Sequence, residues 1–245
     1  MTQYEAVAQA LEQLGGVATL AQLYHQVPKI PGCAWKTKTP NASIRRIVQL
    51  HKGIFKIKPG LYGLLSMKPA IESRGIIQET AKNKGSQDLQ QSNHSYYQGL
   101  LLTVGRLRQH QCWAPNQDRN KAFLGGTIGT ARTLDDLPSF SYPDLVKRCA
   151  TVDVIWFNQR RMPASLFEVE YSTDIQNSLL KFCDLQDFHT RMVIVAERLR
   201  HPEFRAKLSY SAFADIRDRV SFLDFTSLVK QYEHIAAQAQ TEVAL

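Results

Sequence analysis

Closely spaced cysteines are missing from this sequence of 245 residues, which holds four cysteines in all. They lie far apart along the chain, at Cys33, Cys112, Cys149 and Cys183. Zinc sites and disulfide frameworks need cysteines at short or paired spacings, so the pattern favours neither kind of site. We expect four reduced thiols.

Long apolar runs are also missing. No stretch approaches the roughly 18 apolar residues of a membrane helix. The first residues, among them Thr2, Gln3 and Glu5, lack the basic and apolar regions of a signal peptide. No Gly-Lys-Ser or Gly-Lys-Thr follows Gly125, Gly126 and Gly129, so this glycine-bearing segment is not a phosphate-binding loop. We expect no membrane partner and a cytoplasmic location.

The positive charge is unevenly distributed. The formal net charge is +8, and a hydrophobic content of 44% is that of a globular protein with one large or two modest domains. Residues 1–68 hold nine Lys or Arg and two Glu, whereas residues 91–245 hold eighteen basic and seventeen acidic residues. A concentrated basic region attracts polyanions, of which nucleic acid is the commonest.

Residues 1–66 have the pattern of a winged helix. Apolar residues recur every three or four positions from Tyr4 to Leu14, which predicts a first helix. Thr19 and Gln22 form a capping box for a second helix, and Thr39-Pro40 begins a third. The segment from Phe55 to Leu64 then alternates, turns at Pro59-Gly60 and returns, which predicts a two-stranded wing.

The third helix carries side chains that can contact base edges, and nearby lysines can contact phosphates. The candidate DNA-binding residues are Lys36, Lys38, Asn41, Ser43, Arg45, Arg46, Gln49, Lys56 and Lys58. The end of this segment resembles the HARE-HTH type of winged helix, found at the N-termini of some restriction enzymes and in chromatin-associated proteins; the matching residues are Phe55, Pro59, Gly60, Leu61, Tyr62 and Leu64. The resemblance implies double-stranded DNA as a partner. A solvated basic face and a protein-docking module are the alternatives.

A polar segment follows. Hydrophobic density drops over residues 67–92, where Lys82 to Gln87 is strongly polar, and we interpret this segment as a linker. Residues 93–245 then form a second domain. The helical pattern from Tyr96 to His110 is followed by a short strand near Gln111 and, after an irregular region, by two strands of β-branched and aromatic residues.

Three carboxylates occur in these two strands, Val152–Phe157 and Ala164–Glu170. A symmetric loop centred between Arg160 and Arg161 places Asp153 opposite Glu168, and alternation places Glu170 on the same face as Glu168. Clustered buried carboxylates repel one another, so such a cluster needs a cation. Hard oxygen ligands favour Mg²⁺, with Mn²⁺ as a substitute. The alternative is a solvated face on which the glutamates pair with Arg160 or Arg161.

The order of elements after Tyr96 is helix, three strands, helix and strand, the last being Arg191–Ala196. With an Asp on the second strand and Glu-x-Glu on the third, this order resembles the PD-(D/E)XK nuclease superfamily. The resemblance implies that Asp153 and Glu168 bind metal, while Glu170 stands where that superfamily usually has Lys. Weaker candidates on the following helix are Gln176, Asn177 and Lys181.

The expected fold class is α/β (α+β), with an N-terminal winged helix before a restriction-endonuclease-like mixed-sheet core. The implied function is a Mg²⁺-dependent DNA endonuclease of a restriction or genome-defence system, with Asp153, Glu168 and Glu170 as catalytic and metal-binding residues. Cleavage of both strands favours a homodimer. Two alternatives stay open: a DNA-binding regulator or subunit with an inactive nuclease-like domain, and an adaptor that docks protein through its winged helix.

Overall fold

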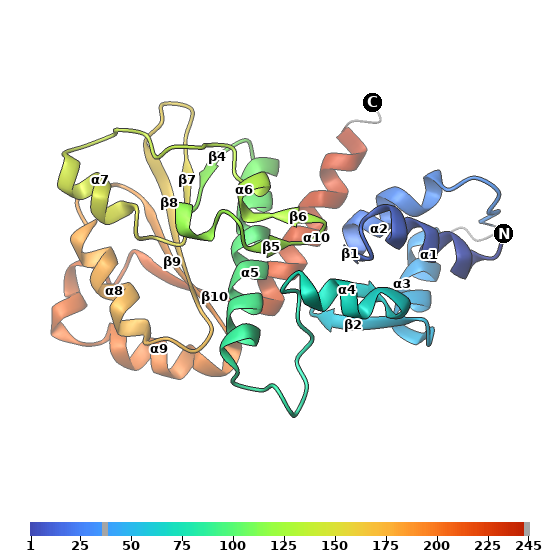
Figure 1. Cartoon of the computed structure of the whole chain (residues 1–245). Coiled ribbons are helices and arrows are strands. Elements are labelled where there is room, and N and C mark those ends of the chain that lie inside the picture. Colours follow the sequence, from blue (N-terminus) through green and yellow to red (C-terminus); the bar gives the residue numbers. More distant parts are fainter. Residues whose placement is uncertain (36–38, 243–245) are drawn as a thin grey trace. The chain divides into compact units, whose positions relative to one another are not determined.

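The computed structural model describes residues 1–35 and 39–242, which form two compact units (Figure 1). Unit 1 comprises residues 1–92, 122–126 and the end of the chain from Glu233, and unit 2 comprises residues 93–121 and 127–232. Both contain helices and strands, which confirms the mixed fold class. The segment predicted as a linker, residues 67–92, carries helix α4 (Lys68–Ser73) and lies within unit 1.

Three helices and a small sheet make up most of unit 1. The helices are α1 (Gln3–Gln13), α2 (Leu20–Gln26) and α3 (Pro40–Leu50). The strands are β1 (Val17–Thr19), β2 (Ile54–Lys58) and β3 (Leu61–Leu64), paired antiparallel in the order β1-β3-β2. The predicted capping box at Thr19 and Gln22 is present, and both side chains satisfy backbone N–H groups at the start of α2.

The apolar stripes of these helices form the core of unit 1. Val7 and Leu11 of α1, Leu23 of α2 and Ile44 of α3 are buried together, as their helical spacing predicts. The chain leaves α1 through Gly15 and Gly16, whose φ angles of 82° and 85° lie in the left-handed region that glycine tolerates best.

A five-stranded mixed sheet is the centre of unit 2. Its strands are β4 (Gln111–Trp113), β7 (Val154–Phe157), β8 (Pro163–Glu170), β9 (Arg191–Ala196) and β10 (Val220–Asp224), in the order β10-β9-β8-β7-β4. Strands β4, β7 and β8 pair antiparallel, whereas β8, β9 and β10 run parallel. Strands β4, β7, β8 and β9 correspond to predicted strands, and β10 was not predicted.

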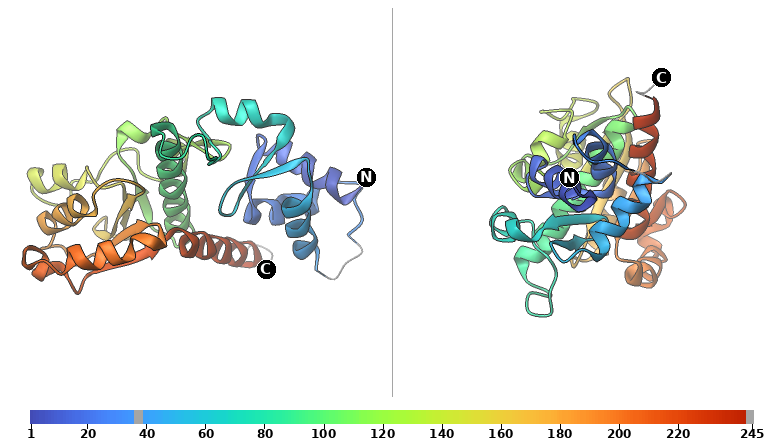
Figure 2. Two further views of the ribbon diagram at one scale, coloured as in Figure 1. Left: turned by 90° about the horizontal axis from the view of Figure 1, so that it is seen from below. Right: turned by 90° about the vertical axis from the view of Figure 1, so that its right-hand side faces the viewer.

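Helices cover both faces of this sheet (Figures 1 and 2). Helices α8 (Ile175–Asp184) and α9 (His201–Leu208) bury the main apolar core against one face. Helix α5 (Gln87–Leu107) packs on the other face, where the indole Nε1 of Trp156 donates to the carbonyl of Leu101 at 3.1 Å. The remaining α-helices and strands are α6 (Ile128–Ala131), α7 (Pro143–Cys149), α10 (Phe225–Glu242) and the short pair β5 (Ala122–Phe123) and β6 (Gly126–Thr127).

Asp174 and Pro143 lie at the starts of two helices of unit 2. Helix α8 begins after Asp174, whose carboxylate accepts from the Gln176 N–H at 2.9 Å, so Asp174 is its cap. Pro143 and Asp144 begin helix α7 and contribute to no strand. No helix within residues 1–35 and 39–242 has the length and apolarity that crossing a membrane requires.

Candidate active site

The register of the central hairpin is the predicted one at the acidic end. Val154 pairs with Phe167, which places Asp153, just before β7, opposite Glu168. The loop itself is not symmetric, because the register shifts between Trp156 and Phe157. The carboxylates lie at the end of the hairpin away from this loop, so the irregularity does not reach them.

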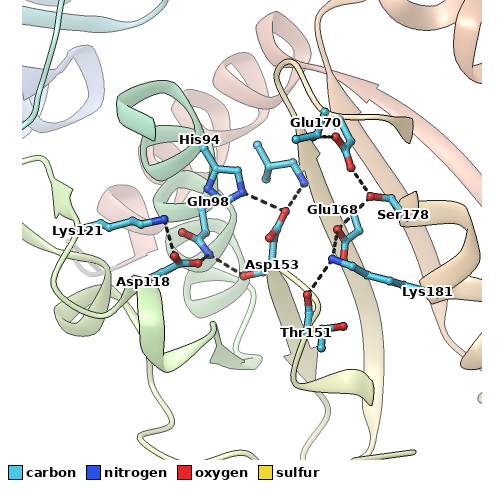
Figure 3. A network of polar contacts seen from close by, with 12 residues as sticks. His94, Gln98, Asp118, Lys121, Thr151, Asp153, Glu168, Glu170, Ser178 and Lys181 are labelled. Atoms are coloured by element: carbon cyan, nitrogen blue, oxygen red, sulfur yellow. Dashed lines mark hydrogen bonds and ion pairs between the residues drawn. The ribbon is translucent and has the colours of Figure 1, made fainter. Parts of the chain in front are cut away.

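Asp153 is held from two sides (Figure 3). Its Oδ2 atom accepts the backbone N–H of Val169 at 2.8 Å and lies 3.1 Å from Nε2 of His94 on helix α5. Its other oxygen, Oδ1, has no hydrogen-bond partner among the described residues, and 17% of the side chain is exposed. One oxygen of Asp153 is therefore fixed by the protein and the other is available.

Glu168 is buried against helix α8 and pairs with Lys181. The Lys181 Nζ atom lies 3.0 Å from Oε1 and 2.8 Å from Oε2 of Glu168, and it also donates to the carbonyl of Thr151 at 2.9 Å. Only 2% of the Glu168 side chain is exposed. The partner of Glu168 is thus Lys181, and the alternative pairing with the exposed Arg160 or Arg161 is wrong.

Glu170 lies on the same sheet face and is linked to Glu168 through a hydroxyl. Ser178 Oγ lies within hydrogen-bonding distance of both carboxylates: it is 3.1 Å from Glu168 Oε2 and makes a short contact with Glu170 Oε1. Thr173 also donates to Glu170. The three predicted acids therefore converge, as alternation along β8 requires.

A second polar network supports this cluster from helix α5. Gln98, which is fully buried, donates through Nε2 to the backbone carbonyl of Asp153 and to Oδ2 of Asp118, both at 2.9 Å. Lys121 contacts Oδ1 of Asp118 at 2.6 Å. Nδ1 of His94 and Oε1 of Gln98 are buried and have no hydrogen-bond partner in the described part of the chain.

The electrostatics of the cluster separate the two facing acids. Burial raises the pKa of Asp153, but the His94 imidazole and the Val169 N–H outweigh it, so this pKa lies below its usual value. Burial and then the Asp153 carboxylate raise the pKa of Glu168 well above its usual value, against the opposing effect of Lys181. Burial lowers the pKa of Lys181, yet Glu168 outweighs it and the net pKa is raised. The positive charge of Lys181 therefore does not offset the burial and the repulsion that disfavour the ionised form of Glu168.

The donor chemistry of this cluster fits Mg²⁺. This ion is usually held by one or two carboxylates together with water and substrate phosphate oxygens. Asp153 offers a free oxygen, and Glu168 is a buried carboxylate with too little compensating charge. No three His, Cys, Asp or Glu side chains in the described ranges are grouped closely enough to enclose a metal by themselves. Two acids with solvent and phosphate satisfy Mg²⁺ without such a group.

A hollow of about 530 Å³ lies over helix α3 in unit 1. Four predicted DNA-binding residues line it together with Tyr24, Thr39 and Ala42: Asn41, Arg45, Arg46 and Gln49. All four are exposed or half-exposed, whereas Ser43 does not line the hollow. The Nε atom of Arg45 donates to the Tyr24 hydroxyl at 3.0 Å, and 52% of the Arg45 side chain stays exposed for other contacts.

The lysines that were predicted to bind phosphate differ in their exposure to solvent. Lys56 is exposed on β2. Lys58 is not available for phosphate: its side chain is 5% exposed, and Nζ donates to the carbonyl of Ile77 at 3.0 Å. The register of β2 against β3 shifts between Lys56 and Lys58, so the strict alternation that put both on one face fails. Lys36 and Lys38 lie outside the described residues.

A family model of the Type II restriction enzyme NmeDI C-terminal domain matches residues 75–243. The chain belongs to this family. The matched range includes the five-stranded sheet, the three carboxylates, Lys181 and His94. Neither a curated protein nor a solved structure matches the chain.

Several residues of this polar cluster were missed or given too little weight in the sequence analysis. Lys181 was a weak candidate, although Ser178 and Lys181 are three residues apart on one face of the helix that follows the acids. Gln176 and Asn177, given equal weight, contact none of the three acids. His94 precedes the predicted helix start at Tyr96, and α5 in fact begins at Gln87. Asp118 lies in a region left unassigned.

Proposed function

We propose that this chain is a restriction endonuclease that hydrolyses phosphodiester bonds of double-stranded DNA with Mg²⁺, or with Mn²⁺ as a substitute. The observation that carries the proposal is the convergence of Asp153, Glu168 and Glu170 beside Lys181, within a domain of the NmeDI C-terminal family. We further propose that its core is a variant of the PD-(D/E)XK nucleases.

In this proposal Asp153 and Glu168 would hold the metal. Glu170 would hold Ser178, whose hydroxyl also contacts Glu168. A bound Mg²⁺ supplies charge at the scissile phosphate and lowers the pKa of a water. Lys181 compensates the charge of Glu168 and supplies, from helix α8, the cationic donor that the PD-(D/E)XK pattern usually has at the position of Glu170. Its ammonium group would orient the attacking water in exchange for one of its contacts with Glu168 or Thr151.

We propose that residues 1–66 form a winged helix that binds the DNA. The exposed face of α3 carries Asn41, Arg45 and Gln49, whose side chains can make bidentate contacts with bases. Arg46 and Lys56 contribute phosphate contacts. Cleavage of both strands by a single site per chain favours a homodimer on DNA. We place the reaction in the cytoplasm, where the four free cysteines stay reduced.

One other function has a specific observation in its favour. Both oxygens of Glu168 are engaged by Lys181, and Lys does not occupy the Glu170 position. These features suit a DNA-binding regulator or subunit with an inactive nuclease-like domain. Incubation of the purified protein with supercoiled plasmid and Mg²⁺ separates the two: an endonuclease yields nicked and linear DNA, and the inactive form binds without cutting.

A further inference from the structure

The contact between His94 and Asp153 joins two elements that are remote in sequence. His94 lies on α5 and Asp153 lies just before β7, with Nε2 of His94 at 3.1 Å from Oδ2 of Asp153 (Figure 3). A carboxylate oxygen cannot donate to an imidazole nitrogen when it is ionised, so Nε2 must carry the proton in this pair. The same Oδ2 accepts the Val169 N–H at 2.8 Å.

Both hydrogen bonds end on one oxygen of Asp153. Oδ2 is therefore committed to the protein, and the carboxylate plane is fixed by two donors on different elements, α5 and β8. Gln98, one turn further along α5, donates to the backbone carbonyl of the same residue at 2.9 Å. Helix α5 thus holds both the main chain and the side chain of Asp153, while Oδ1 stays without a partner among the described residues.

A purely structural tie between helix and sheet does not explain all of this arrangement. Nδ1 of His94 and Oε1 of Gln98 are buried without a hydrogen-bond partner in the part of the chain that the structure describes. Each such atom has lost its hydrogen bonds to bulk water without gaining a partner in the protein, which destabilises the fold. Buried polar atoms without a partner need an explanation, and a side chain held in place for function supplies one.

We propose that His94 is a positioning residue of the active site: by committing Oδ2 of Asp153, it presents Oδ1 to the metal ion. The inference rests on the proposed function, because it assigns a role within the same site. Hydrogen-bond donors that orient metal-binding carboxylates typically change metal affinity by about 10- to 100-fold when removed. The role needs the N–H donor at that position and not the imidazole ring as such.

The variants that test this role differ in whether they keep a donor within reach of Asp153. His94→Gln retains an N–H group on a side chain of similar length, His94→Asn retains one on a shorter side chain, and His94→Leu has none. Arg106→Gln is the control, because Arg106 is exposed on the last turn of the same helix. The His94→Asn variant keeps a polar side chain at this site, so the comparison with His94→Gln remains usable if His94→Leu does not fold.

Binding of Mn²⁺ to the metal-free full chain, measured by titration calorimetry, is the readout. We expect His94→Leu and His94→Asn to raise the Kd by at least about 10-fold, and His94→Gln and Arg106→Gln to stay within about threefold of the wild type. Cleavage by His94→Leu should recover as Mn²⁺ is raised, since the defect lies in metal affinity. His94→Leu or His94→Asn with wild-type Mn²⁺ affinity would overturn the positioning role and leave the nuclease proposal standing. A wild type that binds no Mn²⁺ and cuts no plasmid would overturn both.

Discussion

The Nζ atom of Lys181 lies 2.8 Å from Oε2 and 3.0 Å from Oε1 of Glu168, and so it ties helix α8 to strand β8. Burial raises the pKa of the Glu168 carboxylate well above its usual value, and the pair places a cation beside this carboxylate. In the proposed active site, Lys181 would supply from the next helix the positive charge that the resemblance places at the position of Glu170.

Replacing Lys181 tests this role directly. Lys181→Met should lower the rate of plasmid cleavage roughly 100-fold, because a preorganised charged donor is lost at the reacting group. It should also lower the free energy of unfolding by about 1–3 kcal/mol, since Glu168 stays buried without its partner and is rescued only by taking up a proton. Lys147→Met, on the exposed face of α7, is the matched control and should change neither quantity.

Removal of the Glu168 charge should separate stability from function. Glu168→Gln should abolish cleavage, yet leave the metal-free protein within about 1 kcal/mol of the wild type, because the charged carboxylate is already disfavoured by burial and by Asp153. Mg²⁺ should raise the melting temperature of the wild type by mass action and leave that of Glu168→Gln unchanged. A variant that melts much lower, combined with a wild type indifferent to Mg²⁺, would identify Glu168 as a structural residue.

The stability of unit 1 should depend on pH through Lys58. Burial lowers the pKa of Lys58 to about 7 in the folded protein, against the smaller opposing effect of Glu79. Below pH 7 the ammonium is charged in both states and its burial destabilises the fold. Above about pH 7 the Lys58 amine is neutral in the folded state, whereas in the unfolded state it stays protonated up to its pKa near 10.4. The unfolded state therefore binds more protons in this range, so stability increases as pH rises.

The variant Lys58→Met should remove this dependence. At a pH of about 6.5 its free energy of unfolding should exceed that of the wild type by roughly 2–4 kcal/mol, and the difference should shrink as the pH approaches about 10. Urea unfolding at several pH values provides the measurement. Lys56→Met, at an exposed position of the same strand, should show no such trend. Equal pH profiles for wild type and Lys58→Met would refute the buried-charge assignment.

Substitutions on α3 and β2 should alter DNA binding by unit 1, and Lys56 and Lys58 should differ in their effect. Arg45→Ala should weaken binding by about 1–3 kcal/mol through loss of a base contact, and Arg46→Ala should weaken it further and reduce the salt slope through loss of a phosphate contact. Lys56→Ala should reduce the slope of log K against log salt by about one, as expected for one phosphate contact. Lys58→Ala should leave that slope unchanged, because its Nζ is bonded to Ile77 inside the unit. Unchanged affinity and salt slope in the arginine and Lys56 variants would exclude α3 and β2 as the DNA-binding surface.

The parts of the fold that could be predicted are those set by local periodicity. Alternation along β8 placed Glu170 on the same face as Glu168, and the capping box at Thr19 located α2. The pairing of Asp153 with Glu168 was predicted from a symmetric loop, and it holds at the acidic end although the loop itself is not symmetric. Lys58 was misplaced because the register shift in β2 depends on pairing with β3, which alternation along one strand does not encode.

The missing parts of the site depend on tertiary packing. His94 and Asp153 are 59 positions apart in the sequence, and only the packing of α5 on the sheet brings them together. Lys181 lies closer, but its partner depends on how α8 is rotated about its own axis. Contacts between remote elements leave no periodic signal in a single sequence.

Cleavage of supercoiled plasmid tests the central claim most directly. The purified protein should convert the plasmid to nicked and linear forms with Mg²⁺ and should leave it intact with a chelator, and Asp153→Asn should cut at no detectable rate while still binding DNA. A wild type that binds the plasmid but leaves it uncut with either Mg²⁺ or Mn²⁺ would contradict the account, as would an Asp153→Asn variant that cuts as fast as the wild type.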